Sequence, residues 1–551
     1  MSTVLDQPTP GAERPTPDAT AHSAVRRVAI NALSPFAAQL VTKLLMLGYL
    51  LVQYRLIGGG RHALDEYFLA GSVFLYTSTI ADWGLTTLVT REAARDHDQP
   101  ERVALLFQQT LSLRLLISAA LFLPVGLYIA IYATLFDLSA QGGWATLILT
   151  ACLLPAAFSG SVTALLYAYE RMTLPATIGV VTSLVNVVLG VGALMLGWGI
   201  TGLALAAFFA TCLTALIFWR VLRRDFPHVA GHLRLDLSTL SLDRRMALSL
   251  LNMGWPLMLN ALLVGLFFRA DQFIIKPIAG GLAVEQYQAA YSFINFVLLI
   301  TPAVTLALFP RMARHAATDR ARLAREYTFA LKVLLLISVP VVLSTLWFAP
   351  LLITVLTGKP EYLPQSAIAL QILILFLPFS FINGLTQYVL IALDLQRLIT
   401  KAFGLTVAFN VTANLLLVPV LGIYGAALVT ILSEIVLLIP FMIWTGREIG
   451  RVPILSMLGR PVVGGLAAGL LMWPLGPLAQ HWSSDWVGLA LYLSAGILIA
   501  MLSVAATLFL RHLTPAEMRV LLGAARFPGR QKAPPPVVEE GAGDRGVPAG
   551  R

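Results

Sequence analysis

Long apolar segments alternate with short polar segments along nearly the whole chain, from about residue 28 to residue 511. Each apolar segment is long enough for an α-helix to cross the roughly 30 Å of hydrocarbon in a bilayer. The pattern predicts about fourteen transmembrane helices, at 28–55, 66–90, 103–134, 144–169, 174–197, 201–221, 247–275, 285–310, 324–356, 364–393, 398–419, 422–445, 457–478 and 486–510. We therefore expect an all-α polytopic membrane protein.

Two of these spans carry polar residues and a proline in steps of four, a spacing that places them on one face of a helix. The positions are Asn31, Pro35 and Gln39 in the first span and Asn252, Pro256 and Asn260 in the seventh. Arg269 and Asp271 also lie inside the seventh span. Because lipid offers no partner for such groups, these faces must contact protein or a water-filled cavity. The repeated face predicts a transport chamber between two related lobes.

The composition supports a membrane protein, since 58% of the residues are hydrophobic and only 12% are charged. Soluble domains hold about 25% charged residues, so an ordinary soluble enzyme is excluded. The net charge of +10 does not indicate a nucleic-acid partner, because membrane proteins concentrate Lys and Arg in cytoplasmic loops. Cys152 and Cys212 both lie in apolar spans, so they predict neither a disulfide framework nor a metal site.

Positive charge is divided unevenly between the predicted loops. If the N-terminus is cytoplasmic, the inner loops hold Arg91, Arg95, Arg102, Arg171, Arg220, Arg223, Arg224, Arg234, Arg244, Arg245, Arg311, Arg314, Arg320, Arg322, Arg325, Arg397, Lys401, Arg447, Arg451 and Arg460. The outer loops hold little beyond Arg55, Arg61, Lys276 and Lys359. Since Lys and Arg accumulate on the cytoplasmic side, we expect both termini to be cytoplasmic.

An internal repeat organises the first twelve spans. Matching residues recur in the same order at an offset of about 220: Tyr67 and Ala70 with Tyr287 and Ala290, Arg91 with Arg311, Thr110 and Arg114 with Thr328 and Lys332, Tyr167–Glu170 with Ile391–Asp394, and Gly199–Gly202 with Gly422–Gly425. Six spans are an even number, so both copies have the same topology. The repeat predicts two related six-helix lobes.

The chain is expected to divide accordingly. The parts are a disordered cytoplasmic tail (1–25), an N-lobe of helices 1–6 (26–222), a basic cytoplasmic linker (223–246), a C-lobe of helices 7–12 (247–446), two further helices (447–511) and a linker-like cytoplasmic tail (512–551).

Five short motifs support a family resemblance through their order along the chain. They are Ala81–Leu85, Tyr167–Met172, Gly199–Ala204, Arg269–Asp271 and Gly422–Ala426. Over about residues 25–510 the chain resembles the Wzx-type polysaccharide (O-antigen) flippases of the multidrug/oligosaccharidyl-lipid/polysaccharide (MOP) exporter superfamily. The resemblance implies an inner-membrane protein that moves a polyprenyl-pyrophosphate-linked oligosaccharide to the periplasmic leaflet by alternating access.

Such a cargo needs buried cations for its phosphates and a polar chamber for its sugars. The chamber candidates are Asn31, Gln39, Lys43, Arg114, Asn252, Asn260, Arg269 and Lys332. Lys43 shares the polar face of the first span and lies about 18 Å along the helix from Asn31, too deep for easy snorkelling. A structural ion pair is the alternative for Lys43. Arg114 and Lys332 are equivalent in the repeat and either clamp the pyrophosphate or mark the inner interface.

Three acids at membrane depth are candidates for ion coupling: Asp82, Asp271 and Glu434. The alternative for Asp82 is a helix-capping or Arg-paired carboxylate near the interface. Arg269 and Asp271 are two residues apart and do not share a helix face, so each is expected to find its partner on another helix.

Two other transporter functions remain open, namely a lipid II flippase and a drug or cation antiporter of the multidrug and toxin extrusion (MATE) type. A membrane glycosyltransferase would need a sizeable periplasmic loop with catalytic acids, and the predicted outer loops are short. No catalytic residue, metal site or cofactor is predicted, although an H⁺ or Na⁺ gradient is an expected energy source. The expected partners are the lipid-linked oligosaccharide, membrane lipids and a polysaccharide polymerase, with no nucleic acid.

Overall fold

The computed structural model describes residues 17–57, 63–96, 98–232, 243–472, 486–510, 512–515 and 517–518. Within these ranges the chain is helical and contains no strand. The N-lobe contains α1 (Pro17–Leu56), α2 (Ala63–Asp82), α3 (Leu85–Arg95), α4 (Pro100–Ala120), α5 (Phe122–Leu135), α6 (Ala140–Ala151), α7 (Leu153–Ala168), α8 (Thr173–Met195), α9 (Gly199–Asp225) and the short α10 (Pro227–His232).

The C-lobe and the helices beyond it complete the fold. They are α11 (Arg244–Ala279), α12 (Gly281–Val297), α13 (Ile300–Thr318), α14 (Arg320–Thr357), the 3₁₀ turn η2 (Pro360–Tyr362), α15 (Gln365–Ile374), α16 (Leu377–Ala392), α17 (Gln396–Leu421), α18 (Ile423–Ile449), α19 (Ile454–Met472) and α21 (Trp486–Phe509).

Within the described residues, each predicted span corresponds to one helix or to two successive helices. By length and apolarity, ten helical spans among the described residues can cross a membrane, or eleven if the bent pair α15 and α16 counts as one. The all-α polytopic fold is therefore confirmed, and fourteen crossings remain a prediction. Part of the difference between fourteen predicted and ten or eleven observed spans lies in the predicted span 66–90. There the polar end of α2 separates it from the short helix α3.

The internal repeat is visible in the backbone. Gly199 and Gly422, at equivalent helix starts, both have positive φ angles, of 56° and 58°. Glu170 and Asp394, also equivalent, have φ angles of 58° and 60°, although neither is glycine. Two copies that share a rarely populated conformation at the same places have the same turn structure.

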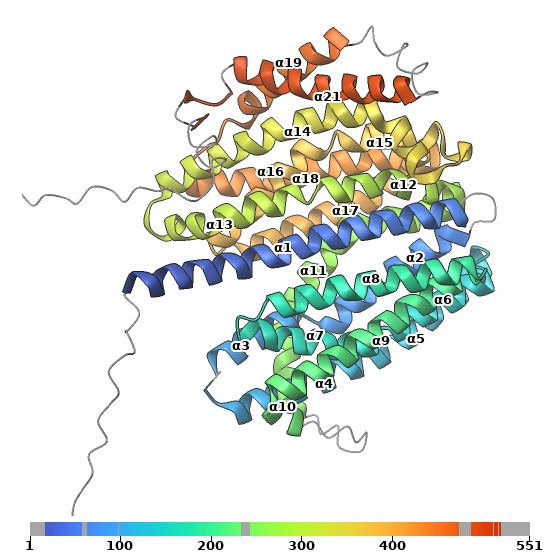
Figure 1. Ribbon diagram of the computed structural model, residues 1–551, viewed down its shortest axis with the longest axis vertical. Coiled ribbons are helices and arrows are strands. Elements are labelled where there is room, and N and C mark those ends of the chain that lie inside the picture. Colours follow the sequence, from blue (N-terminus) through green and yellow to red (C-terminus); the bar gives the residue numbers. More distant parts are fainter. Residues whose placement is uncertain are drawn as a thin grey trace, which may run out of the picture.

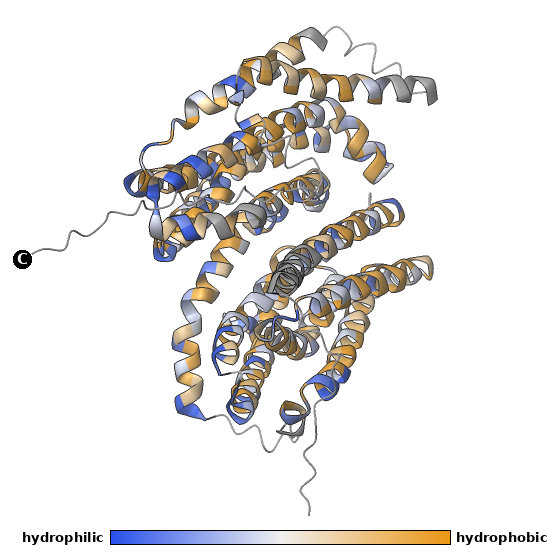
Figure 2. Cartoon of the chain, turned by 60° about the vertical axis from the view of Figure 1, so that its left-hand side comes forward, coloured by the Kyte–Doolittle hydropathy of each residue, from blue (hydrophilic) through white to orange (hydrophobic). Residues whose placement is uncertain are grey.

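The lobes lie on either side of α1, which runs between them in Figure 1, and α11 passes from one lobe to the other. α11 begins against α3 and α4 of the N-lobe and later packs against α17 of the C-lobe. The helices α19 and α21 pack on α14, outside the repeat. In Figure 2 apolar residues cover the helix flanks and hydrophilic residues gather near helix ends, as a membrane protein requires.

The helices α2 and α11 run antiparallel and form a seam along which the two lobes meet. At one end of the seam, Gly84 and Gly254 allow close approach: a Cβ on Gly254 would lie 2.2 Å from the backbone oxygen of Trp83. The indole of Trp83 donates a hydrogen bond to the carbonyl oxygen of Leu251 at 3.0 Å. Further along, the Ser72 hydroxyl donates to the Gln272 side chain at 3.0 Å. We call the end nearest Trp83 the basic end, because Arg91, Arg95, Arg244 and Arg245 adjoin it.

At the opposite end of the seam, which we call the closed end, buried polar groups join the lobes. Lys276 of α11 forms an ion pair with Asp65 of α2 at 2.6 Å, and both side chains are buried. The backbone N–H of Asp65 donates to Glu285 of α12, and the Tyr54 hydroxyl donates to the carbonyl oxygen of Glu285. Arg55 donates to the carbonyl oxygen of Val355 in α14. The ion pair and these hydrogen bonds thus hold the two lobes in contact at this end.

The terminal segments differ from expectation. α1 begins at Pro17, so 17–25 is helical rather than disordered, because Pro17 and the alanines after it favour a helix start that continues the first span. After α21, His512 and Glu517 contact α14 instead of forming a free tail. The other residues of both predicted tails lie outside the described residues.

Candidate functional site

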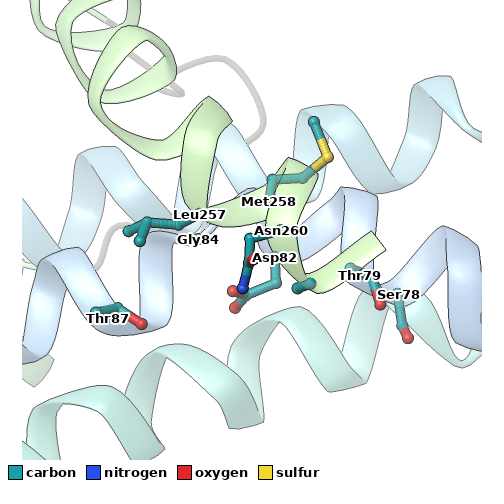
Figure 3. Close-up of a pocket in the computed structure, with 9 residues that line it drawn as sticks. Ser78, Thr79, Asp82, Gly84, Thr87, Leu257, Met258 and Asn260 are labelled. Atoms are coloured by element: carbon teal, nitrogen blue, oxygen red, sulfur yellow. The ribbon is translucent and has the colours of Figure 1, made fainter. Parts of the chain in front are cut away.

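A cavity of about 470 Å³ opens on the seam toward its basic end, between α2, α3 and α11. Its lining is mainly polar and includes no Lys or Arg: Ser78, Thr79, Asp82, Gly84, Thr87, Leu257, Met258, Asn260 and Ala261. Figure 3 shows Asp82 of α2 beside Asn260 of α11, with Ser78 and Thr79 on one side and Thr87 on the other. The volume falls within the range of small-molecule sites. We call this space the polar cavity.

Asp82 is held by an ion pair inside the N-lobe. Its Oδ1 accepts hydrogen bonds from Arg114 of α4, at 2.7 Å, and from Thr86 of α3. Arg114 also donates to Ser161 of α7, and its side chain is only 2% exposed. The Asp82 side chain is 36% exposed and faces the polar cavity. The Asp82 carboxylate is therefore accessible from the cavity, whereas the Arg114 guanidinium is buried behind it.

A second cavity, of about 230 Å³, lies further along the seam and contains the candidate cation Arg269. Its lining comes from α2, α11 and α12: Leu75, Val264, Gly265, Phe268, Arg269, Asn295 and Leu298. Lys43 of α1 is exposed and does not line this cavity. Among the described residues, neither cation forms an ion pair. We call this space the cationic cavity.

The C-lobe buries two acids that have no ion pair within the described part of the chain. Asp271 accepts hydrogen bonds from the Tyr287 hydroxyl and from the backbone of Gln272. Glu434 accepts a hydrogen bond from the Asn383 amide at 2.7 Å. Both carboxyl groups are buried. Neutral donors thus hold them in place.

Lys332 lies away from both cavities. Its ammonium contacts Glu517 at 2.8 Å, and the His512 ring contacts its carbonyl oxygen. Burial alone would raise the pKa of Glu517, but hydrogen bonds from Lys332 and Thr514 outweigh burial and hold this pKa below its usual value. Lys332 therefore attaches the segment after α21 to α14.

The remaining chamber candidates are dispersed. Gln39 and Asn252 are exposed on α1 and α11. Asn260 lines the polar cavity and accepts a hydrogen bond from Thr400 of α17. The side chain of Asn31 lies outside the described residues. The described part of the chain contains no group of three His, Cys, Asp or Glu residues placed to hold a metal ion.

Sequence reasoning did not single out several polar residues of the seam. Ser78, Thr79 and Thr87 line the polar cavity, and Asn295 lines the cationic one. The first three belong to the polar stretch around Asp82 in an otherwise apolar span, a signal that could have been used. Asn383, the partner of Glu434, could not be paired with it from spacing, because 51 residues separate them.

The fold is that of the MOP transporters. The chain is similar to a structure titled "Lipid II flippase MurJ, inward closed conformation", with a TM-score of 0.70 and 14% identity, covering 86% of this chain and 98% of that one. It is also similar to an outward-facing MATE multidrug transporter, with a TM-score of 0.57 and 17% identity over 76% of this chain and 95% of that one. A Pyrococcus furiosus MOP transporter gives a TM-score of 0.55 and 18% identity, covering 76% and 95%.

Sequence comparison identifies the family to which the chain belongs. Residues 28–316, more than half of the chain, match the family described as "Polysaccharide biosynthesis protein". The chain belongs to this family. Residues 256–416 also match the MatE family, which agrees with the MATE-like fold. No curated protein matches the sequence.

Proposed function

We propose that this protein flips a polyprenyl-pyrophosphate-linked oligosaccharide across the bacterial inner membrane during polysaccharide biosynthesis, by alternating access. Its family and the fold that it shares with MurJ support a lipid-linked cargo. The observation that carries the proposal is Arg269, a cation on the seam that lines a cavity and has no ion pair among the described residues.

The charges of the cationic cavity suit a diphosphate. Arg269 lines this cavity without an ion pair among the described residues, and a cation at membrane depth is costly without a partner. An anion bound at Arg269 removes this penalty and gains charge-assisted hydrogen bonds, which Arg can make to phosphate in bidentate fashion. A cationic antiporter substrate would instead bring a second positive charge into this cavity.

In this proposal the basic end faces the cytoplasm and the closed end faces the periplasm. Positive residues at the basic end support this orientation. The ion pair between Lys276 and Asp65 then closes the periplasmic side while cargo enters from the cytoplasm. Release requires this pair to part and the basic end to close. A polymerase in the periplasm would use the flipped product.

Ion coupling is assigned to the C-lobe acids in this proposal. Glu434 and Asp271 are buried with neutral donors, so binding of H⁺ or Na⁺ changes the local charge without breaking an ion pair. Asp82, the third candidate, already has Arg114 as its ion-pair partner. We therefore assign Asp82 to the cargo site rather than to coupling.

The test is complementation of a flippase-null strain, together with flipping of its lipid-linked oligosaccharide in proteoliposomes. Arg269→Ala and Lys43→Ala are expected to lower flipping at least tenfold, and Arg269→Lys should retain part of it. Arg224→Ala is the matched control, because Arg224 is 89% exposed at the end of α9. Full activity of Arg269→Ala would remove the proposal's main support.

The same variants separate the alternatives. Rescue of a MurJ-depleted strain, without rescue of the flippase-null strain, would indicate a lipid II flippase. Extrusion of cationic drugs that survives Arg269→Ala would indicate a MATE-type antiporter. The proposal assigns no catalytic residue.

A further inference from the structure

We infer that the polar cavity is a subsite for the sugars next to the pyrophosphate, and that Asp82 makes it select against acidic sugars. This inference rests on the proposed function, because it takes the phosphates to lie in the cationic cavity. It extends the proposed function by stating which sugars the protein accepts.

The two cavities follow one another along the same seam. Leu75 lines one and Asp82 the other, about 10 Å apart along α2, and Arg269 and Asn260 are about 14 Å apart along α11. The polar cavity lies on the side of the basic end and is the larger of the two. With the phosphates at Arg269, a glycan that extends toward the basic end enters the polar cavity.

The lining of the polar cavity matches sugar chemistry. Hydroxyl groups come from Ser78, Thr79 and Thr87, and an amide comes from Asn260. The hydroxyls of Ser78 and Thr79 donate to backbone oxygens, which leaves their lone pairs free to accept hydrogen bonds from sugar hydroxyls. Because no Lys or Arg lines this cavity, it offers no direct cationic partner for a phosphate or a uronate.

Asp82 supplies the charge that discriminates. Its Oδ1 is occupied by Arg114 and Thr86, whereas its Oδ2 has no hydrogen-bond partner within the described residues. Arg114 is only 2% exposed, so it pairs with the carboxylate from inside the N-lobe and remains out of reach of the cargo. A sugar hydroxyl or ammonium can donate to Oδ2, but the carboxylate of a uronic acid is repelled by it.

The test compares two probes that differ only at carbon 6 of the sugar, glucosyl and glucuronosyl geranyl diphosphate. Binding of each to the purified full chain in detergent is measured by calorimetry, with geranyl diphosphate as a sugar-free reference. We expect the glucosyl probe to bind about tenfold more tightly, equivalent to about 1.4 kcal/mol. Asp82→Asn should bring this ratio close to one.

Asn260→Asp provides a second test that does not disturb the ion pair. It adds a carboxylate to the same cavity and should raise the ratio above the wild-type value, even if Asp82→Asn fails to fold. Asn252→Asp is the matched control, because Asn252 is exposed on α11 outside the cavity, and it should leave the ratio unchanged.

The outcomes separate the two proposals. If geranyl diphosphate binds but the wild type and Asn260→Asp do not distinguish the two sugars, the sugar subsite is wrong and the flippase proposal stands. If the wild type binds neither geranyl diphosphate nor either sugar probe, the cationic cavity is not a diphosphate site and both proposals fail.

Discussion

The N-lobe and the C-lobe bury ionisable side chains in different ways. In the N-lobe, Arg114 and Asp82 form an ion pair in which each charge has the other as its partner. In the C-lobe, Glu434 is held by the Asn383 amide and Asp271 by the Tyr287 hydroxyl. An ion pair resists a change of protonation because its partner would lose its counter-charge, whereas neutral donors tolerate one. In the proposed function, the N-lobe pair therefore carries a fixed charge and the C-lobe acids carry the exchangeable one.

The largest expected effect is at the closed end, where Lys276 forms ion pairs with Asp65 and Glu66 across the lobes. Lys276→Met leaves the Asp65 carboxylate buried without a cation, at a cost of about 4 kcal/mol. We expect lower stability in detergent and a longer distance between spin labels at Gln141 and Glu361, which are exposed on opposite lobes. Lys276→Arg, which keeps the charge, is the control. An unchanged distance in a folded Lys276→Met variant would contradict the role of this pair.

The next largest effect is a loss of stability when the ion pair between Arg114 and Asp82 in the N-lobe is broken. Asp82→Ala leaves Arg114 charged and almost fully buried, so it should reduce the free energy of unfolding by about 3 kcal/mol. Arg114→Met should cost less, because the remaining Asp82 is partly exposed. A double-mutant cycle of denaturation experiments checks the coupling. Additive losses would mean that the two charges do not support one another.

A smaller change in stability is expected at Glu434, with a large change in function. Glu434→Gln keeps a side-chain oxygen for the Asn383 amide, so its effect on stability should stay below about 1 kcal/mol. Flipping in proteoliposomes should, however, no longer respond to an imposed H⁺ or Na⁺ gradient. Asp82→Asn is the comparison and should retain the response. If Glu434→Gln retains it too, the exchangeable charge lies elsewhere.

The smallest effect concerns the contact between Glu517 and Lys332. The pKa of Glu517 is lower in the folded protein than its usual 4.5. The stabilisation is therefore present above the pKa of the unfolded chain and is lost as the pH falls through the folded value. We expect less than about 1 kcal/mol for this partly exposed pair. The protection factors for amide hydrogen exchange at His512 and Leu513 should fall below pH 4.5 in the wild type and already be low at neutral pH in Glu517→Gln.

Much of the architecture follows from the sequence alone. Apolar segment lengths are enough to predict an all-α membrane protein, because only a helix satisfies its own backbone within lipid over such a length. The offset of about 220 predicted the two lobes, and the matched φ angles at Glu170 and Asp394 show how closely the copies agree. Local sequence carries this information, since helices and turns depend on neighbouring residues.

Only the tertiary structure decided which polar groups meet. Arg114 and Lys332 are equivalent in the repeat, yet one is buried against Asp82 and the other binds Glu517 near the end of the chain. Asp65 and Lys276, 211 residues apart, form the ion pair of the closed end. Spacing places a residue on a helix face, but its partner depends on how distant helices pack. The division of the seam into a polar and a cationic cavity therefore emerged only from the fold.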